Sequence, residues 1–296
     1  MSIVATVNRL RYTLWPIRVA WLVLPLVAGE GFAGLLTGRR APVVIVGGAL
    51  LWLAWGCGLV ALLVAHPLGL TALRVIVPAG FVSALAGLLS DSRSGADVVA
   101  VLAMTLVGLG ALSGSTADSL VDGASYGPER RFALRSPTAL AVLVVPFASM
   151  VVLAGAVTGP LLLASQRWVP GVIACVVGFA AAWRAGLGLH SLSLRWLVFV
   201  PAGFVVHDRM TLADPVLMPR ATIASVGPAL ADSAAVDLTG RAAGLLIEVR
   251  LRSSVPAARR DGRRACEQVE LSEFLVAPLR PGAFLKASAR AGLLRR

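Results

Sequence analysis

The stretch 138-TALAVLVVPFASMVVLAGAVTGPL-161 contains no charged residue and determines the class of this protein. A membrane hydrocarbon core of about 30 Å needs roughly 20 apolar residues in an α-helix, so this stretch is long enough to cross a bilayer. Five further apolar runs lie at 14–36, 42–65, 68–90, 97–113 and 169–189. We therefore predict an α-helical membrane bundle of six transmembrane helices over residues 1–189.

The composition agrees with a membrane protein. Of the 296 residues, 57% are hydrophobic and 14% are charged, and the mean hydropathy is +0.83. These values differ strongly from those of soluble domains. The first apolar run is too long for a signal peptide and further runs follow it directly, so we interpret it as a retained membrane anchor.

The arginines between the apolar runs predict an orientation. Arg9 and Arg11 precede the first run, the inner loop 114–137 carries three more arginines, and the tail from residue 190 is basic. Because membrane proteins keep such loops in the cytoplasm, we expect both termini to be cytoplasmic, although Arg39 and Arg40 favour the opposite side. An arginine-rich chain with Lys286 as its sole lysine is typical of GC-rich bacteria, which indicates a bacterial plasma membrane.

Three charged residues within the predicted spans are functional candidates, because charge inside a membrane is costly. Arg74 and Arg184 lie near the inner ends of their spans, where their long side chains can reach the membrane surface. Glu30 lies deeper in the first span. It is either protonated, or it faces the bundle and pairs with a loop arginine such as Arg93. The functional alternative is that Glu30 handles protons or a substrate.

The inner loop contains a pattern associated with hydrolases. Residues 123–127, GASYG, match G-x-S-x-G. That motif requires a strand before the serine and a helix after it, whereas here a membrane helix and a polar loop precede it and Pro128 follows. The three histidines, His66, His190 and His207, form no recognisable partner set. We therefore interpret the match as turn chemistry, and the loop as a structured connector that contacts the tail.

Residues 190–296 change from helical to alternating periodicity and predict a second, mainly-β domain. Residues 196–200 and 204–207 form a candidate hairpin around a Pro-Ala-Gly turn, and 247–251 alternate as a half-buried strand. Further strands are expected at 216–218, 223–226 and 269–276, with a polar loop at 253–264. Pro281 starts a predicted closing helix.

Part of this domain resembles a known family. The runs 195-RWLVFVPAGFVVHDR-209, 218-MPRATIASV-226 and 276-VAPLRPGAF-284 are similar to bacterial pleckstrin-homology-like (PH-like) domains that are attached to membrane helices. The whole chain resembles actinobacterial multi-pass membrane proteins with such a C-terminal domain, and the similarity covers about a third of its length. The resemblance implies a small β-sandwich or barrel capped by a helix, usually without catalysis, and assigns no binding residues.

A basic cluster in the tail is the best candidate for a binding surface. It consists of Arg259, Arg260, Arg263 and Arg264. Because arginines near a membrane attract anionic lipids, the cluster is a candidate lipid contact. The alternative interpretation is that these arginines belong to a hairpin loop in solvent and bind nothing. Nucleic acid is not an expected partner, since no stacking aromatics surround the cluster and no DNA-binding motif is present.

The sequence contains no P-loop, no H-E-x-x-H motif and no CxxC spacing, so we expect no cofactor, no metal site and no catalytic residues. We predict a non-enzymatic membrane protein that presents a cytoplasmic PH-like module. Its expected partners are anionic lipids, another membrane or cytoplasmic protein, or a second copy of the chain. The alternative is a small-solute transporter or channel with the β domain as a regulatory cap, which would bury Glu30 in a wet cavity.

Overall fold

The computed structural model describes residues 3–91, 93–261 and 265–293. The chain divides into two compact units. The helical unit comprises Met1–Leu120 and Val144–His190, and the β unit comprises Val121–Leu143 and Ser191–Arg296.

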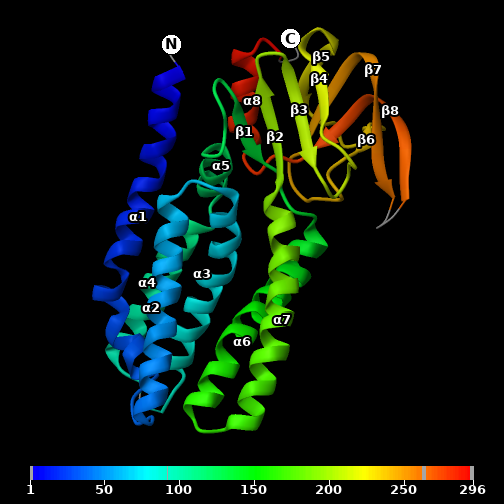
Figure 1. Cartoon of the computed structure of the whole chain (residues 1–296). Helices are drawn as coiled ribbons and strands as arrows, with labels where there is room; N and C mark the ends of the chain where they lie inside the picture. Colours follow the sequence, from blue (N-terminus) through cyan, green and yellow to red (C-terminus); the bar gives the residue numbers. More distant parts are fainter. Residues whose placement is uncertain (1–2, 92, 262–264, 294–296) are drawn as a thin grey trace. The chain divides into compact units, whose positions relative to one another are not determined.

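The helical unit consists of long apolar helices (Figure 1). They are α1 (Ile3–Gly34), α2 (Ala41–Leu63), α3 (Pro67–Leu88), α4 (Gly95–Ala111), α6 (Val145–Ala164, preceded by a π-helical turn at Leu140–Val144) and α7 (Trp168–Ser193). Among the described residues, five helices are long and apolar enough to span a membrane, and there are six if α4 and the short α5 (Gly114–Asp122), bent by 52°, form one span. The prediction of an apolar helical part followed by a β-rich part is therefore confirmed.

Small residues and capping groups set the helix contacts and ends. Gly155 of α6 and Gly178 of α7 lie against each other so closely that a Cβ on Gly155 would lie 2.2 Å from the carbonyl oxygen of Gly178. Such contacts are how membrane helices approach closely. At the start of α4, Ser94 and Asp97 form a capping box, in which the Asp97 carboxylate accepts the Ser94 backbone N–H at 2.7 Å.

A proline inside α3 creates a polar contact with α6. Pro78 has no N–H, so the carbonyl of Arg74, one turn earlier, lacks its helical donor. The hydroxyl of Ser149 on α6 donates to this carbonyl at 3.2 Å. In a membrane an unsatisfied carbonyl is costly, so this bond joins the two helices where the sequence interrupts one of them.

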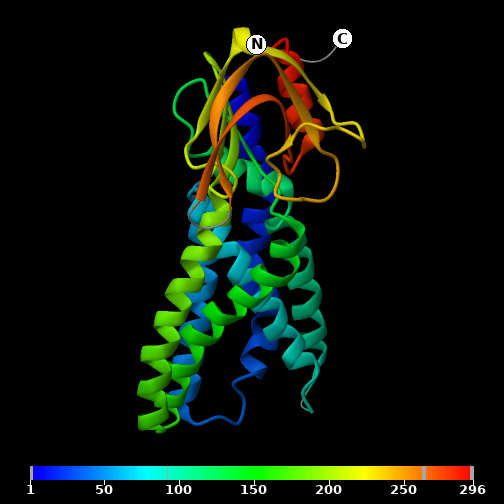
Figure 2. The same cartoon turned by 90° about the vertical axis from the view of Figure 1, so that its right-hand side faces the viewer.

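The β unit contains two four-stranded sheets and a final helix (Figure 2). The first sheet has the order β1-β2-β3-β4 and is antiparallel throughout. Its strands are Arg130–Ala133, Arg195–Val200, Gly203–Asp208 and Val216–Pro219. The second has the order β5-β7-β8-β6, with β6 parallel to β8. Its strands in chain order are Ile223–Pro228, Val236–Asp237, Ile247–Asp261 and Ala265–Val276, and helix α8 covers Pro281–Arg290.

The first strand of this unit comes from the inner loop rather than from the tail. β1 pairs with β2 in antiparallel register, with Phe132 opposite Leu197, and Phe132 is 1% exposed. The expected boundary at residue 190 describes only the second segment of the β unit, since Val121–Leu143 also belongs to it. Helices α6 and α7 are thus inserted in the sequence between the first two strands of the β unit.

The predicted polar loop at 253–264 is wrong for the residues that the structure describes. Strand β7 continues to Asp261 and pairs with β8 as far as Ala265. Serine, proline and alanine have low strand propensity, which is why the sequence indicates a loop here. Pairing with β8 stabilises this part of β7 instead. The pairing is irregular between Arg250 and Val255 and is regular from Val255 onward.

Helix α8 closes the core of the β unit. The ring of Phe284 is fully buried and lies 5.2–5.8 Å, between ring centroids, from those of Phe132, Phe199 and Phe204. Such aromatic contacts add to the hydrophobic stabilisation of burial. Residues of the inner loop, the β2–β3 hairpin and the C-terminal helix therefore share one core.

Candidate functional site

The described members of the basic cluster, Arg259 and Arg260, lie at the end of β7 and are already bonded. The guanidinium of Arg259 donates to the carboxylate of Glu267 on β8 at 3.0 Å, and both side chains are more than a third exposed. Arg260 donates to the carbonyl of Leu212 at 3.2 Å. Arg263 and Arg264 lie outside the described residues. Because exposed ion pairs contribute little free energy, Arg259 can exchange Glu267 for another anion at low cost.

The three intramembrane candidates are on three different helices. Glu30 on α1 and Arg184 on α7 are exposed, and Arg74 on α3 is half-buried. The suggested pairing of Glu30 with Arg93 is absent from the described residues. Glu30 is exposed, so it does not have the burial in a cavity that the transporter alternative predicts.

The G-x-S-x-G match lies between helix α5 and strand β1, the reverse of the order that the hydrolase motif requires. The hydroxyl of Ser125 donates to the carboxylate of Asp122 at 3.3 Å. The same carboxylate accepts the backbone N–H of Arg131 at 2.7 Å. The serine thus takes part in the turn that leads into β1.

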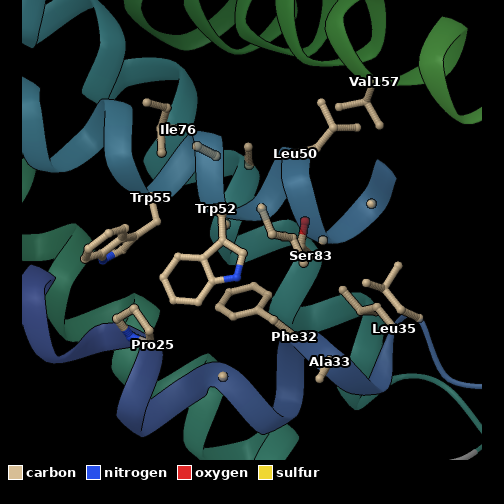
Figure 3. A pocket seen from close by; sticks show the side chains of 18 of the residues that line it. Pro25, Phe32, Ala33, Leu35, Leu50, Trp52, Trp55, Ile76, Ser83 and Val157 are labelled. Carbon is tan, nitrogen blue, oxygen red and sulfur yellow. The ribbon is translucent and has the colours of Figure 1, made fainter. Parts of the chain in front are cut away.

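A half-open cavity of about 730 Å³ lies in the helical unit, among α1, α2, α3, α4 and α6 (Figure 3). This volume is within the range of small-molecule sites. Side chains from α1 and α2 provide most of the aromatic surface, and Figure 3 shows Phe32, Trp52 and Trp55 around the same space. The few polar lining groups include Ser83, Ser165 and Arg39.

One end of the cavity is built on a reciprocal contact between two tryptophans. The indole N–H of Trp21 donates to the carbonyl of Trp55, and the indole N–H of Trp55 donates to the carbonyl of Trp21, both at 2.9 Å. Pro25 explains the second bond, because it removes the helical donor that the Trp21 carbonyl would otherwise have. Gly58 leaves the space that the Trp21 ring occupies, since a Cβ at residue 58 would lie 2.1 Å from that ring.

The opposite end of the cavity is basic. Arg39 lines it, and Arg40 reaches Gln166 of the α6–α7 loop, with 3.5 Å between the guanidinium nitrogen and the amide oxygen. The loops 35–40 and 165–167 together contain three arginines, Arg39, Arg40 and Arg167, and no acidic residue. The cavity therefore has an aromatic end inside the bundle and a cationic end at the loops.

The sequence interpretation did not single out Trp21, Trp52 or Trp55. One signal could have found part of the site: Trp21 is followed four residues later by Pro25, which predicts an unsatisfied carbonyl and hence a donor from a neighbouring helix. Nothing comparable marks Trp52, whose position depends on how the helices pack.

No known protein-family model matches the chain, and neither a curated protein nor a solved structure shows significant similarity to it. The resemblance to PH-like domains therefore stays a hypothesis.

Proposed function

We propose that this chain is a multi-pass protein of a bacterial plasma membrane that acts by binding rather than catalysis. In this proposal the β unit is a cytoplasmic PH-like module for assembly with a protein or for contact with anionic lipid. One observation carries the proposal: β1 precedes α6 and β2 follows α7, and the two strands pair. The β unit is therefore joined to the helical unit at three chain connections, at residues 120/121, 143/144 and 190/191, which supports a module held on membrane helices.

The architecture of the β unit supports the PH-like assignment. Two mainly antiparallel sheets and a C-terminal helix that enters the core through Phe284 are what the resemblance implies. The charge supports an anionic partner, since Val121–Leu143 and Ser191–Arg296 together contain 18 basic and 11 acidic residues. Basic surfaces near a cytoplasmic leaflet attract its anionic lipids.

The test extracts the full-length protein with its native lipids and identifies the co-purifying lipids and proteins by mass spectrometry. The test variant changes Arg259, Arg260, Arg263 and Arg264 to Ser. A control variant changes Arg209, Arg252, Lys286 and Arg290 to Ser, which removes the same charge from exposed positions elsewhere in the β unit.

Loss of anionic lipid or of a stoichiometric protein from the test variant alone would support the cluster as the contact surface. Unchanged lipid and protein partners in the test variant would refute the cluster's role. Equal losses from both variants would indicate a general charge effect and would also count against it.

The second candidate is a transporter or channel with the β unit as a regulatory cap, and the cavity favours it. The apolar lining fits a hydrophobic cargo better than an ion, and the exposed Glu30 gives no support to proton coupling. Flux of a candidate solute into vesicles that contain the protein, compared with a Glu30→Leu variant, tests this alternative.

A further inference from the structure

The cavity in the helical unit has the two chemical properties of a binding site for an anionic amphiphile. Its walls are aromatic and aliphatic, from Trp21 at one end to Leu36 near the other, and its rim carries Arg39. The aliphatic and aromatic side chains that line this space of about 730 Å³ would gain packing partners from a hydrocarbon chain. Water is a poor occupant, since few lining groups offer hydrogen bonds.

The length of the cavity matches one leaflet of a membrane. Its lining residues on α1 extend from Trp21 to Ala33, twelve residues further along the helix, or about 18 Å at 1.5 Å per residue. Half of a hydrocarbon core of about 30 Å is about 15 Å. A lipid chain that enters at the loop end would therefore reach the Trp21–Trp55 contact.

The charge at the loop end selects the headgroup. Arg39, Arg40 and Arg167 are exposed, and their two loops contain no acidic residue to neutralise them. Guanidinium groups bind phosphate and carboxylate oxygens through paired hydrogen bonds. A zwitterionic headgroup would gain less from this end than an anionic one.

We infer that this cavity binds the hydrocarbon chain of an anionic lipid, with its headgroup at Arg39 and Arg40. The inference goes beyond the proposed function, because it involves the helical unit alone and uses no residue of the β unit. The shared chemistry, one apolar chain and one anionic group, also fits a fatty acid, and the test separates these two sources.

Glycines on two helices allow the cavity to be filled without a clash. Gly29 and Gly48 both line it, and a Cβ on either would have no neighbouring atom within 4 Å. Gly56 has equal free space but does not line the cavity, so it provides a matched control on the same helix as Gly48. The test variants are Gly48→Leu and, as a second independent block, Gly29→Leu; the control is Gly56→Leu.

The experiment measures tryptophan fluorescence of the full-length protein in phosphatidylcholine vesicles. Bromine atoms on a lipid chain quench nearby indoles. Trp15, Trp52, Trp168 and Trp183 are exposed on the helices and are changed to Phe, so that the signal of the helical unit comes from Trp21 and Trp55, while Trp196 stays buried in the β unit. Brominated phosphatidylglycerol, brominated phosphatidylcholine and a brominated fatty acid are compared at equal mole fractions.

We expect brominated phosphatidylglycerol to quench at lower mole fraction than brominated phosphatidylcholine. Gly48→Leu and Gly29→Leu should abolish this difference, while Gly56→Leu retains it. Changing Arg39 and Arg40 to Gln should weaken the anionic preference about fivefold per arginine. Arg93→Gln is the charge control at a different loop and should leave the preference unchanged.

Equal quenching by the anionic and zwitterionic lipids would overturn the inference. The inference would also be overturned if Gly48→Leu and Gly29→Leu both keep the preference for the anionic lipid while their helical circular dichroism matches that of the wild type. Stronger quenching by the fatty acid than by phosphatidylglycerol would identify a free acid as the source of the chain. Because the basic cluster is unchanged in all these variants, failure here is distinguishable from failure of the proposed function.

Discussion

Arg195 and Asp208 lie opposite each other on β2 and β3 and form a two-pronged ion pair in the interior of the β unit. The Arg195 nitrogens Nε and Nη2 donate to the Asp208 oxygens Oδ1 and Oδ2 at 2.8 and 2.7 Å. Both side chains are at most 1% exposed. Arg195 also donates to the carbonyl of Arg135 at 3.1 Å, and Asp208 accepts the N–H of Met210 at 3.0 Å. The pair therefore fixes the hairpin register and the segment after β1.

Asp208→Ala should destabilise the β unit strongly, because it leaves the Arg195 charge buried without its partner. Breaking a buried pair from one side costs about 3–5 kcal/mol. Hydrogen exchange of the β unit in the full-length protein, reconstituted in lipid, would measure the loss. Asp214→Ala, at an exposed position, is the control and should change little. The double change Arg195→Met with Asp208→Leu should recover most of the protection from hydrogen exchange. If Asp208→Ala lowers protection no more than Asp214→Ala does, the ion pair has no structural role.

His207 should make the β unit less stable in acid. Burial lowers the pKa of this imidazole below its ordinary 6.5, and the nearby Arg209 charge lowers it further. Its Nδ1 donates to the carbonyl of Leu194 at 3.0 Å, and its ring stacks on Trp196 at 4.6 Å between centroids. Because the folded state binds the proton less well than the unfolded state, stability is present above pH 6.5 and falls as the pH drops toward the lowered pKa. Thermal unfolding between pH 7.5 and 5 should show this slope, and His207→Gln should reduce it. An unchanged slope in the variant would assign the acid sensitivity to other groups.

Trp55→Phe should destabilise the helical unit more when Pro25 is present than when it is replaced. The phenyl ring keeps most of the packing but removes the donor to the Trp21 carbonyl, and we expect a loss of roughly 1 kcal/mol, as for other polar contacts between membrane helices. Pro25→Ala restores the helical N–H, so the same change should cost less in that background. A double-mutant cycle of unfolding free energies in mixed micelles measures the coupling. Strict additivity of the two changes would show that Pro25 and the indole bond are independent.

A polypeptide that begins at residue 190 should fail to form a stable β unit. It lacks β1, so the edge of β2 and the space occupied by Phe132 and Leu134 in the core would be exposed. Exposed strand edges promote aggregation. Light scattering and near-ultraviolet circular dichroism of this polypeptide would show aggregation and absent tertiary structure, and addition of a peptide covering 121–136 should improve both. A soluble, cooperatively folded 190–296 polypeptide would contradict the assignment of β1.

The apolar helices could be predicted because their signal is local. A run such as 138–161 has the length and composition of a span whatever surrounds it, and the structure has a helix there. The hairpin around residues 201–203 is local in the same sense, since β2 and β3 are joined by a turn. Elements whose stabilising contacts lie within a few residues are therefore recovered from the sequence.

Strand β1 and the cavity could not be predicted, because their contacts are distant in the sequence. The four residues Arg130–Ala133 become a strand only through pairing with β2. The position of Trp52 in a cavity depends on how α1, α2, α3 and α6 face one another. In a membrane helix the lipid-facing and protein-facing sides are both apolar, so periodicity does not distinguish them.

The insertion of α6 and α7 between β1 and β2 also determines the order of events during synthesis. When β1 leaves the ribosome, its partner strand does not yet exist, because residues 134–194 must be translated first. At about 5–20 residues per second this delay lasts several seconds. Throughout it Phe132 has no sheet to join, and β2 follows α7 after the single residue Leu194. The β unit can therefore be completed only after α6 and α7 have been synthesised.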